Sequence, residues 1–240
     1  MPAFHAFAIL AAVALAAPTS AQPARGDQVT FGATPATFGT WSSYSTTLRG
    51  TSSRMSSLGE VQLRSHRVLS DFNQVLVRLG AVYAVPRGPR LMQGVVVSRT
   101  GERGPSNRGT TEFRLHQDAT FAATVSRVRL SQRLRVEERW IGDAPLLIRG
   151  RAQLTAVVPI SGDGPFDLSA SVEPFLRGPG RGAEPVFDRV RLYSGLGVRL
   201  SPALTVRGGL VLEQSAAGPD WQALISVHHG ITLAADGPGQ

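Results

Sequence analysis

A strict two-residue alternation of apolar side chains and arginines is the feature that most limits how this chain can fold. Over residues 126–140, Val128 and Leu130 share one parity, and Arg129 and Arg133 share the other. Alternate residues of a strand point to opposite faces, whereas a helix would scatter the same arginines around its whole circumference. The segment is therefore predicted to be a β-strand with one apolar face and one cationic face.

The same alternation returns along the rest of the chain, in residues 73–85, 111–121, 146–158, 188–200 and 204–214. Glycine, proline and aspartate separate these segments, in tight turns at 143–145 and 201–203 and in longer polar stretches at 99–109 and 178–185. Segments of about 11 residues match the length that a strand needs to cross a membrane. Together with the turns, they predict an all-β fold, a transmembrane antiparallel up-and-down β-barrel.

The barrel is predicted to have twelve strands, with ten as the alternative. Eleven strands can be counted between Trp41 and Leu233. Single-chain bacterial barrels have an even number of strands. Residues 28–38 are the candidate for the additional strand, although Pro35 weakens it.

The first 21 residues are predicted to be a cleaved secretory signal peptide. The apolar run at 6–17 is too short to span a bilayer, and residues 19–21 are small and precede a cut at Gln22. The alternative is a membrane anchor. The mature protein is then a single domain over residues 22–240, and we expect it in the outer membrane of a Gram-negative bacterium.

Composition excludes several other kinds of site. The chain has no cysteine, so it has neither disulfides nor thiolate metal sites. All of its 25 basic residues are arginine, and its net charge is +8. The arginines form no basic run and no interleaved aromatic motif, so no nucleic acid is expected as a partner. No cofactor or metal is expected either, since there is no glycine-rich phosphate loop and no metal-ligand spacing.

Arginines on the polar face suit a barrel interior, where guanidinium groups can pair with carboxylates on neighbouring strands. The predicted lumen charge network consists of Glu112, Arg114, His116, Asp118, Arg127, Arg129, Arg133, Arg135, Glu137, Arg149, Arg151, Arg189, Arg191 and Arg207. Because arginines outnumber acids, the chain is predicted to be a structural barrel or a small, porin-like, anion-preferring channel. Aromatic residues expected at the membrane interfaces are Tyr83, Trp140 and Trp221.

One set of polar residues suggests an alternative function. Ser226 and His228 lie two residues apart on one strand face, and Glu213 is expected on the adjacent strand with the same orientation. Serine, histidine and a carboxylate are the groups that acyl transfer uses. They make these three residues weak catalytic candidates for a barrel-wall lipid hydrolase, of the phospholipase or lipid A deacylase type. We favour the interpretation that they are ordinary polar lumen residues and that the chain is not an enzyme.

Two further alternatives remain open. Glu112, His116 and Asp118 share an inward face and could bind a cation, but we expect them to neutralise the arginines at residues 127–139 of the next strand. A soluble periplasmic β-sandwich that binds a ligand would show the same alternation, because an ordinary sheet also has one apolar and one polar face.

The segment at 187–197, FDRVRLYSGLG, together with residues 200–202, resembles the C-terminal hairpin of an uncharacterised outer-membrane barrel family, the domain of unknown function numbered twenty-four-ninety. Weaker likenesses lie at Trp41 and at residues 112–117, 133–140 and 173–176. The resemblance covers about residues 38–234. It implies an outer-membrane barrel without an established activity and carries over no catalytic residues. Partners expected of such a barrel are outer-membrane lipids, lipopolysaccharide and the barrel-assembly machinery.

Overall fold

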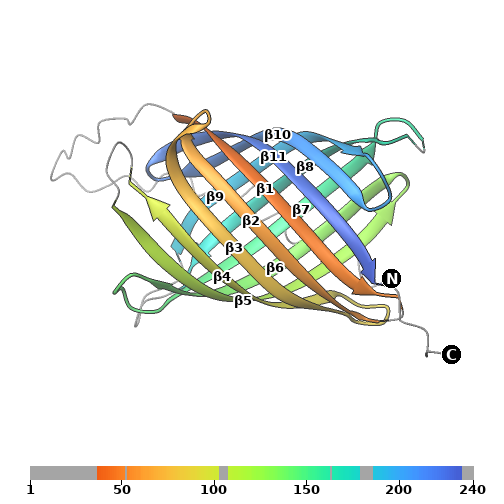
Figure 1. Cartoon of the computed structure of the whole chain (residues 1–240), viewed down its shortest axis with the longest axis horizontal. Coiled ribbons are helices and arrows are strands. Elements are labelled where there is room, and N and C mark those ends of the chain that lie inside the picture. The colour runs from red at the N-terminus through yellow and green to blue at the C-terminus, as the bar shows by residue number, and fades with distance from the viewer. Residues whose placement is uncertain (1–36, 52, 103–107, 163, 179–185, 234–240) are drawn as a thin grey trace. The chain divides into compact units, whose positions relative to one another are not determined.

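The chain folds into one closed barrel of eleven strands (Figure 1). The computed structural model describes residues 37–233 except 52, 103–107, 163 and 179–185. The described residues contain strands and turns but no helix. The strands are β1 (Thr37–Gly50), β2 (Met55–Arg67), β3 (Ser70–Ala84), β4 (Arg90–Gly101), β5 (Gly109–Val125), β6 (Val128–Ile141), β7 (Leu147–Pro159), β8 (Phe166–Arg177), β9 (Val186–Arg199), β10 (Leu204–Ser215) and β11 (Gly218–Leu233).

Each strand pairs with its sequence neighbours in antiparallel fashion, and the barrel closes between β1 and β11. The closing pair is parallel and runs in unbroken register from Thr37 opposite Asp220 to Gly50 opposite Leu233. Figure 1 shows the two strands side by side, pointing the same way. In a meander of alternating direction, a parallel closing pair requires an odd number of strands.

The expectations of twelve or ten strands are therefore wrong for the described residues. The parity argument assumed an antiparallel closing pair, whereas β1 already meets β11 along its full length in parallel. Of the candidate additional strand, residues 37 and 38 belong to β1 and residues 28–36 lie outside the described residues. The predicted signal peptide at 1–21 also lies outside them. Odd-stranded barrels do exist in outer membranes.

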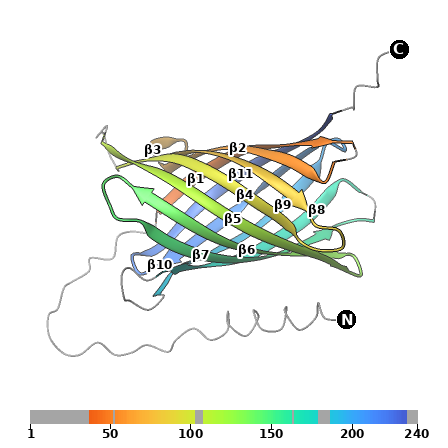
Figure 2. The ribbon, with the colours of Figure 1, turned by 90° about the horizontal axis from the view of Figure 1, so that it is seen from below.

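The barrel has two distinguishable ends. We call the end at which β1 begins the proximal end and the end at which β11 finishes the distal end. Odd-numbered strands run from proximal to distal and even-numbered strands run back, with strong tilt in both views (Figures 1 and 2). A side chain near the start of an odd strand and one near the finish of an even strand therefore lie at the proximal end.

The alternation divides the side chains between the two faces as predicted. In β9, Leu192 and Leu196 face outward and are exposed, while Arg191 faces the lumen. One continuous closed sheet also shows that the β-sandwich alternative, which needs two packed sheets, is wrong. The six predicted strands are confirmed to within four residues at each end; the largest difference is at the end of β5, which finishes at Val125 rather than at residue 121.

Candidate functional site

The interior of the barrel is polar rather than apolar. Among the described residues, five hydrophobic side chains are buried, whereas fifteen polar or charged ones are. Soluble domains show the opposite preference, because an unpaired buried charge is costly. The lumen must therefore supply partners for its charges, and the register of the strands determines which partners meet.

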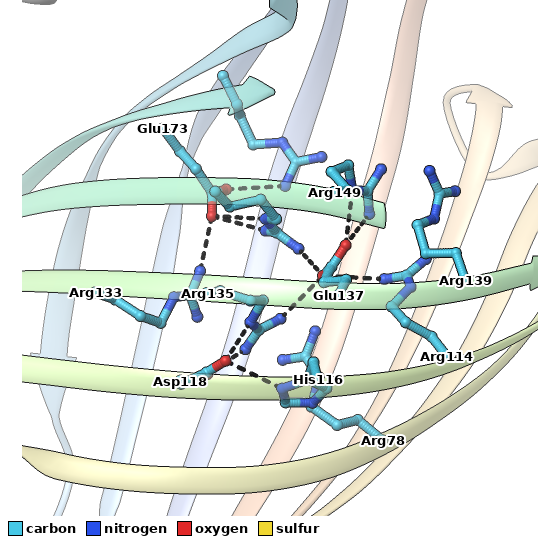
Figure 3. Close-up of polar contacts among 12 residues, drawn as sticks. Arg78, Arg114, His116, Asp118, Arg133, Arg135, Glu137, Arg139, Arg149 and Glu173 are labelled. Atoms are coloured by element: carbon cyan, nitrogen blue, oxygen red, sulfur yellow. Dashed lines mark hydrogen bonds and ion pairs between the residues drawn. The ribbon is translucent and has the colours of Figure 1, made fainter. Parts of the chain in front are cut away.

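Glu137 on β6 is the centre of the largest cluster (Figure 3). Its side chain has no exposed surface, and its carboxylate accepts hydrogen bonds from Arg149 Nε at 2.7 Å and Arg151 Nη1 at 2.8 Å. Arg114 Nη1 and Arg135 Nη1 each lie 3.6 Å from Glu137 Oε1. One carboxylate is thus shared by four guanidinium groups from three strands, β5, β6 and β7.

A second carboxylate of the same cluster, Asp118 on β5, lies directly opposite Arg135. Two hydrogen bonds of 2.6 Å join them in the bidentate geometry that suits a guanidinium and a carboxylate. His116 Nδ1 donates to the same Asp118 at 3.1 Å and is fully buried. A Cβ atom at Gly94, on β4, would collide with the His116 ring, so the glycine provides the space that this histidine occupies.

Glu173 on β8 extends the cluster along the wall, from β6 and β7 to β9. Its Oε1 accepts from Arg133 at 2.8 Å and from Arg151 at 2.7 Å, and its Oε2 from Arg191 at 3.4 Å. The neighbouring Phe175, which is 1% exposed, lies beneath these arginines, with the Arg151 guanidinium 4.5 Å from its ring centroid. Dispersion and cation–π attraction to this ring therefore add to the ion pairs of Arg149, Arg151 and Arg191.

Carboxylates also separate arginines that the register places face to face. Arg114 and Arg139 lie opposite each other on β5 and β6, a pairing that is unfavourable for like charges. Glu112 accepts from Arg139 Nε at 2.5 Å and from Arg114 Nε at 3.1 Å. On the other side of the lumen, Glu213 on β10 accepts from both Arg189, at 2.6 Å, and Arg191, at 2.5 Å.

A cavity of about 650 Å³ lies in the proximal half of the lumen. It reaches the barrel rim at Gly101, Glu102 and Ile141, which lie at the proximal ends of β4 and β6 or just beyond. Its charged lining consists of nine arginines and five glutamates, namely Arg64, Arg78, Arg114, Arg133, Arg139, Arg149, Arg151, Arg189, Arg191, Glu60, Glu102, Glu112, Glu173 and Glu213. The cavity walls therefore carry four more cations than anions.

Two aromatic rings in this lining are in contact with arginines. Trp41 on β1 lies directly opposite Arg64 on β2, whose guanidinium carbon is 3.7 Å from the Trp41 ring centroid. Arg191 reaches the same ring from β9, at 5.0 Å. Phe175, described above, is the second ring. The cavity thus offers positive charge, N–H donors and aromatic surface together.

The distal half of the lumen contains a smaller charged group. Asp167 on β8 is buried and lies 3.2 Å from Arg207 Nη2 and 3.7 Å from Arg129 Nη2. The side chain of Arg129 is about half exposed. An ion pair with a half-exposed arginine contributes little to stability, so we expect the Arg129–Asp167 contact to matter less than the buried pairs of the central cluster.

The structure does not bring Ser226, His228 and Glu213 together. Glu213 does lie on the adjacent strand and face the lumen, but its register partner is Asp220, six residues along β11 from Ser226. Its carboxylate is paired with Arg189 and Arg191, as described. The His228 ring lies 3.0 Å from the hydroxyl of Ser45 on β1 instead.

Most of the predicted lumen network does face the lumen. Arg127 does not, because it lies with Ser126 in the two-residue turn between β5 and β6 and is exposed. Ser126 has a positive φ of 53°, which the tight turn requires. Glu112 and Asp118 pair with arginines of β6, rather than forming a cation site with His116. No group of three or more possible metal ligands was found among the described residues.

Sequence reasoning missed several residues of the cavity, above all Trp41, Glu60, Arg64, Glu173 and Phe175. Alternation could have identified Glu173, since it lies two residues before Phe175 and has the parity of the inward face. Trp41 and Arg64 were harder to recognise, because β1 and β2 are rich in serine and threonine on both faces and their alternation is weak.

The predicted interface aromatics lie on the outer face near the two ends of the barrel. Tyr83 is near the distal end of β3, whereas Trp140 and Trp221 are near the proximal ends of β6 and β11. Tyr83 and Trp221 are exposed, and Trp140 packs against Phe113 with ring centroids 5.6 Å apart. In the part of the chain that is described, no helix is long and apolar enough to cross a membrane.

Comparison with known proteins identifies a family but not a function. Residues 38–223 match the family described as "Protein of unknown function (DUF2490)". No curated protein and no solved structure matches the chain. The matched segment runs from β1 into β11 and includes Trp41, the central cluster and the FDRVRLYSGLG segment on which the resemblance depended. The resemblance is confirmed, and the chain belongs to the DUF2490 family of proteins of unknown function.

Proposed function

We propose that this chain is an outer-membrane β-barrel protein of a Gram-negative cell, exported by a cleaved signal at residues 1–21, with an anion-preferring lumen. The observation that carries the proposal is the inverted burial, with charged residues inside and apolar residues outside. Thirty-five large apolar side chains among the described residues are exposed. Monomeric soluble proteins rarely expose contiguous apolar surface on this scale, whereas a lipid-facing barrel wall requires it.

Strand length and end composition also support a membrane location. The strands have 12 to 17 residues, and a tilted transmembrane strand needs about 9–11. Closure of the sheet leaves no unpaired edge, which is the condition for placing strands in lipid. Outward-facing aromatic residues near both ends fit the interfacial girdles of such barrels.

The lumen sets the expected selectivity and also limits the conductance. Nine arginines against five glutamates in the cavity lining favour anions over cations. Below the cavity, Glu137 and Arg135 are almost completely buried, so side chains fill this part of the lumen. We therefore expect a narrow path with small conductance rather than a wide aqueous pore.

The membrane location is tested by fractionation and by gel mobility. We expect the protein in outer-membrane fractions, and we expect it to migrate differently on a denaturing gel before and after boiling, as folded barrels do. Recovery in the soluble periplasmic fraction, with no dependence on detergent, would contradict the membrane location.

The selectivity is tested by reversal potentials in planar bilayers under a KCl gradient. The expected sign is that of chloride permeation. A cation-selective potential would show that the inward charges do not control permeation. If the inserted protein carries no current, the channel role is wrong and a closed structural barrel remains.

A further inference from the structure

Arg64 is the exception among the arginines that line the cavity. Each of the other eight has a carboxylate oxygen within 2.9 Å. Among the described residues, no carboxylate pairs with Arg64, whose hydrogen bond runs from Nη2 to Gln62 Oε1 at 3.3 Å. Its Nε is buried and has no hydrogen-bond partner. A half-buried guanidinium without an anion is less stable than one that is paired, so Arg64 is the arginine of the lining that a bound anion would stabilise most.

The indole beside Arg64 has the same deficiency. Trp41 Nε1 is buried and has no hydrogen-bond partner, although an indole N–H usually finds one. Two cations, Arg64 at 3.7 Å and Arg191 at 5.0 Å, lie against this ring. Two cations therefore lie against one ring in the cavity wall, while the unpaired Trp41 Nε1 and Arg64 Nε lie behind its surface.

An oxyanion would satisfy this place. Guanidinium N–H groups bind carboxylate and phosphate oxygens in a forked geometry, and Arg64 has no carboxylate partner among the described residues to compete for them. The excess of four cations over anions in the lining leaves charge for a second acidic group. The cavity volume of about 650 Å³ falls within the range of small-molecule sites. This volume is larger than one inorganic ion needs.

We propose that the proximal cavity binds a small soluble molecule with two or more oxyanion groups, one of them held by Arg64 beside Trp41. This proposal rests on the proposed function, because it names the class of ligand that the same anion-preferring lumen would bind. The ligand is soluble rather than a lipid, because the cavity opens at the barrel rim while the lipid-facing surface lies on the other side of the wall. Arg64 acts in this site as a binding residue, and no chemical step is assigned to it.

Binding is measured on the detergent-folded full chain with inorganic pyrophosphate, a compact molecule with two phosphate groups. Calorimetric titration gives the affinity. Replacing Trp140 and Trp221 with phenylalanine leaves Trp41 as the sole tryptophan, whose emission reports whether the ligand reaches this ring. We expect saturable binding and a saturable change in Trp41 emission. Micelles that carry phosphatidic acid should not displace pyrophosphate.

The decisive variant is Arg64→Gln, with Arg199→Gln as its matched control. Arg199 is exposed at the distal end, so both variants lose one positive charge but only one changes the cavity. Arg64→Gln should weaken pyrophosphate binding about ten- to a hundredfold, which is the usual effect of losing a charge-assisted hydrogen-bond pair. Arg64→Lys should be intermediate, since it keeps the charge and loses the fork.

Three outcomes would overturn the proposal: no saturable binding, equal affinity in Arg64→Gln and wild type, or an equal loss in Arg199→Gln, which would indicate a diffuse field. Displacement by phosphatidic acid would overturn the soluble source of the ligand.

Because Arg64 has no carboxylate partner, Arg64→Gln should unfold at the wild-type denaturant concentration or above it, so loss of folding would also count against the site. Failure of conduction in bilayers would leave this binding result intact, so the two proposals fail separately.

Discussion

Replacing Glu137 with glutamine should be the most damaging single charge change in the barrel. The side chain keeps its size and one acceptor oxygen but loses the negative charge that four arginines share. Arg151, Arg135 and Arg114 retain other carboxylate partners. Arg149 does not, because Glu137 is its carboxylate partner among the described residues. Most of the loss should therefore fall on the Glu137–Arg149 pair.

The expected magnitude follows from the burial of the pair. A pair of unit charges at 4 Å interacts by about 4 kcal/mol at an effective dielectric constant of about 20, and removing one partner of a buried pair typically costs about 3–5 kcal/mol. Glu137 has no exposed side-chain surface and the Arg149 side chain is 9% exposed, so little water is available to replace the lost partner. We expect Glu137→Gln to lower the free energy of unfolding by about 3–5 kcal/mol.

The measurement is denaturant-induced unfolding of the barrel in detergent or lipid vesicles, extrapolated linearly to zero denaturant. Glu138→Gln is the control, because Glu138 is the next residue but lies on the outward face. The double variant Glu137→Gln with Arg149→Gln should recover about 1–3 kcal/mol relative to the sum of the single changes. A loss below about 1 kcal/mol, no larger than that of Glu138→Gln, would show that the cluster is hydrated and would refute this reasoning.

Two further substitutions test the wall of the barrel. Leu192→Arg, midway along the outer face of β9, should cost about 2–4 kcal/mol in lipid. Leu200→Arg, just beyond the end of the same strand, should cost about 0–1 kcal/mol, and equal costs would contradict a lipid-facing surface. Gly94→Ala should cost about 1–3 kcal/mol because its methyl group displaces the buried His116, while Gly150→Ala meets only an ordinary contact and should be neutral or stabilising. Both pairs are measured by the same unfolding titration, and an unaffected Gly94→Ala would mean that His116 moves freely.

Much of the fold could be predicted from the sequence because alternation fixes strand identity and face at the same time. Parity alone predicts that the arginines of β6 and β9 face the lumen. A shift of one residue would exchange the two faces and place these arginines in the outer wall. The boundary at Arg127 was missed because the turn residues Ser126 and Arg127 include neither glycine nor asparagine, the residues that usually mark a two-residue turn.

Closure and charge pairing could not be predicted in the same way. Alternation describes each strand separately, but the parallel closing pair depends on how the first and last strands meet. The sharing of Glu137 by arginines of three strands likewise depends on register, because a shift of two residues would retain every inward face and change every partner. The Trp41–Arg64 stack also depends on register and could not be read from either strand alone.

The parallel closure has a consequence for circular permutation of this barrel. In an even-stranded meander the start of the first strand and the finish of the last strand lie at the same end, and a short loop can join them. Here the finish of β11 at Leu233 and the start of β1 at Thr37 are at opposite ends. A connector must therefore run back along the wall, over about 14 extended residues at about 3.3 Å each. Inserted between β11 and β1, it would be antiparallel to both, so the permuted protein would need a twelfth strand as its linker.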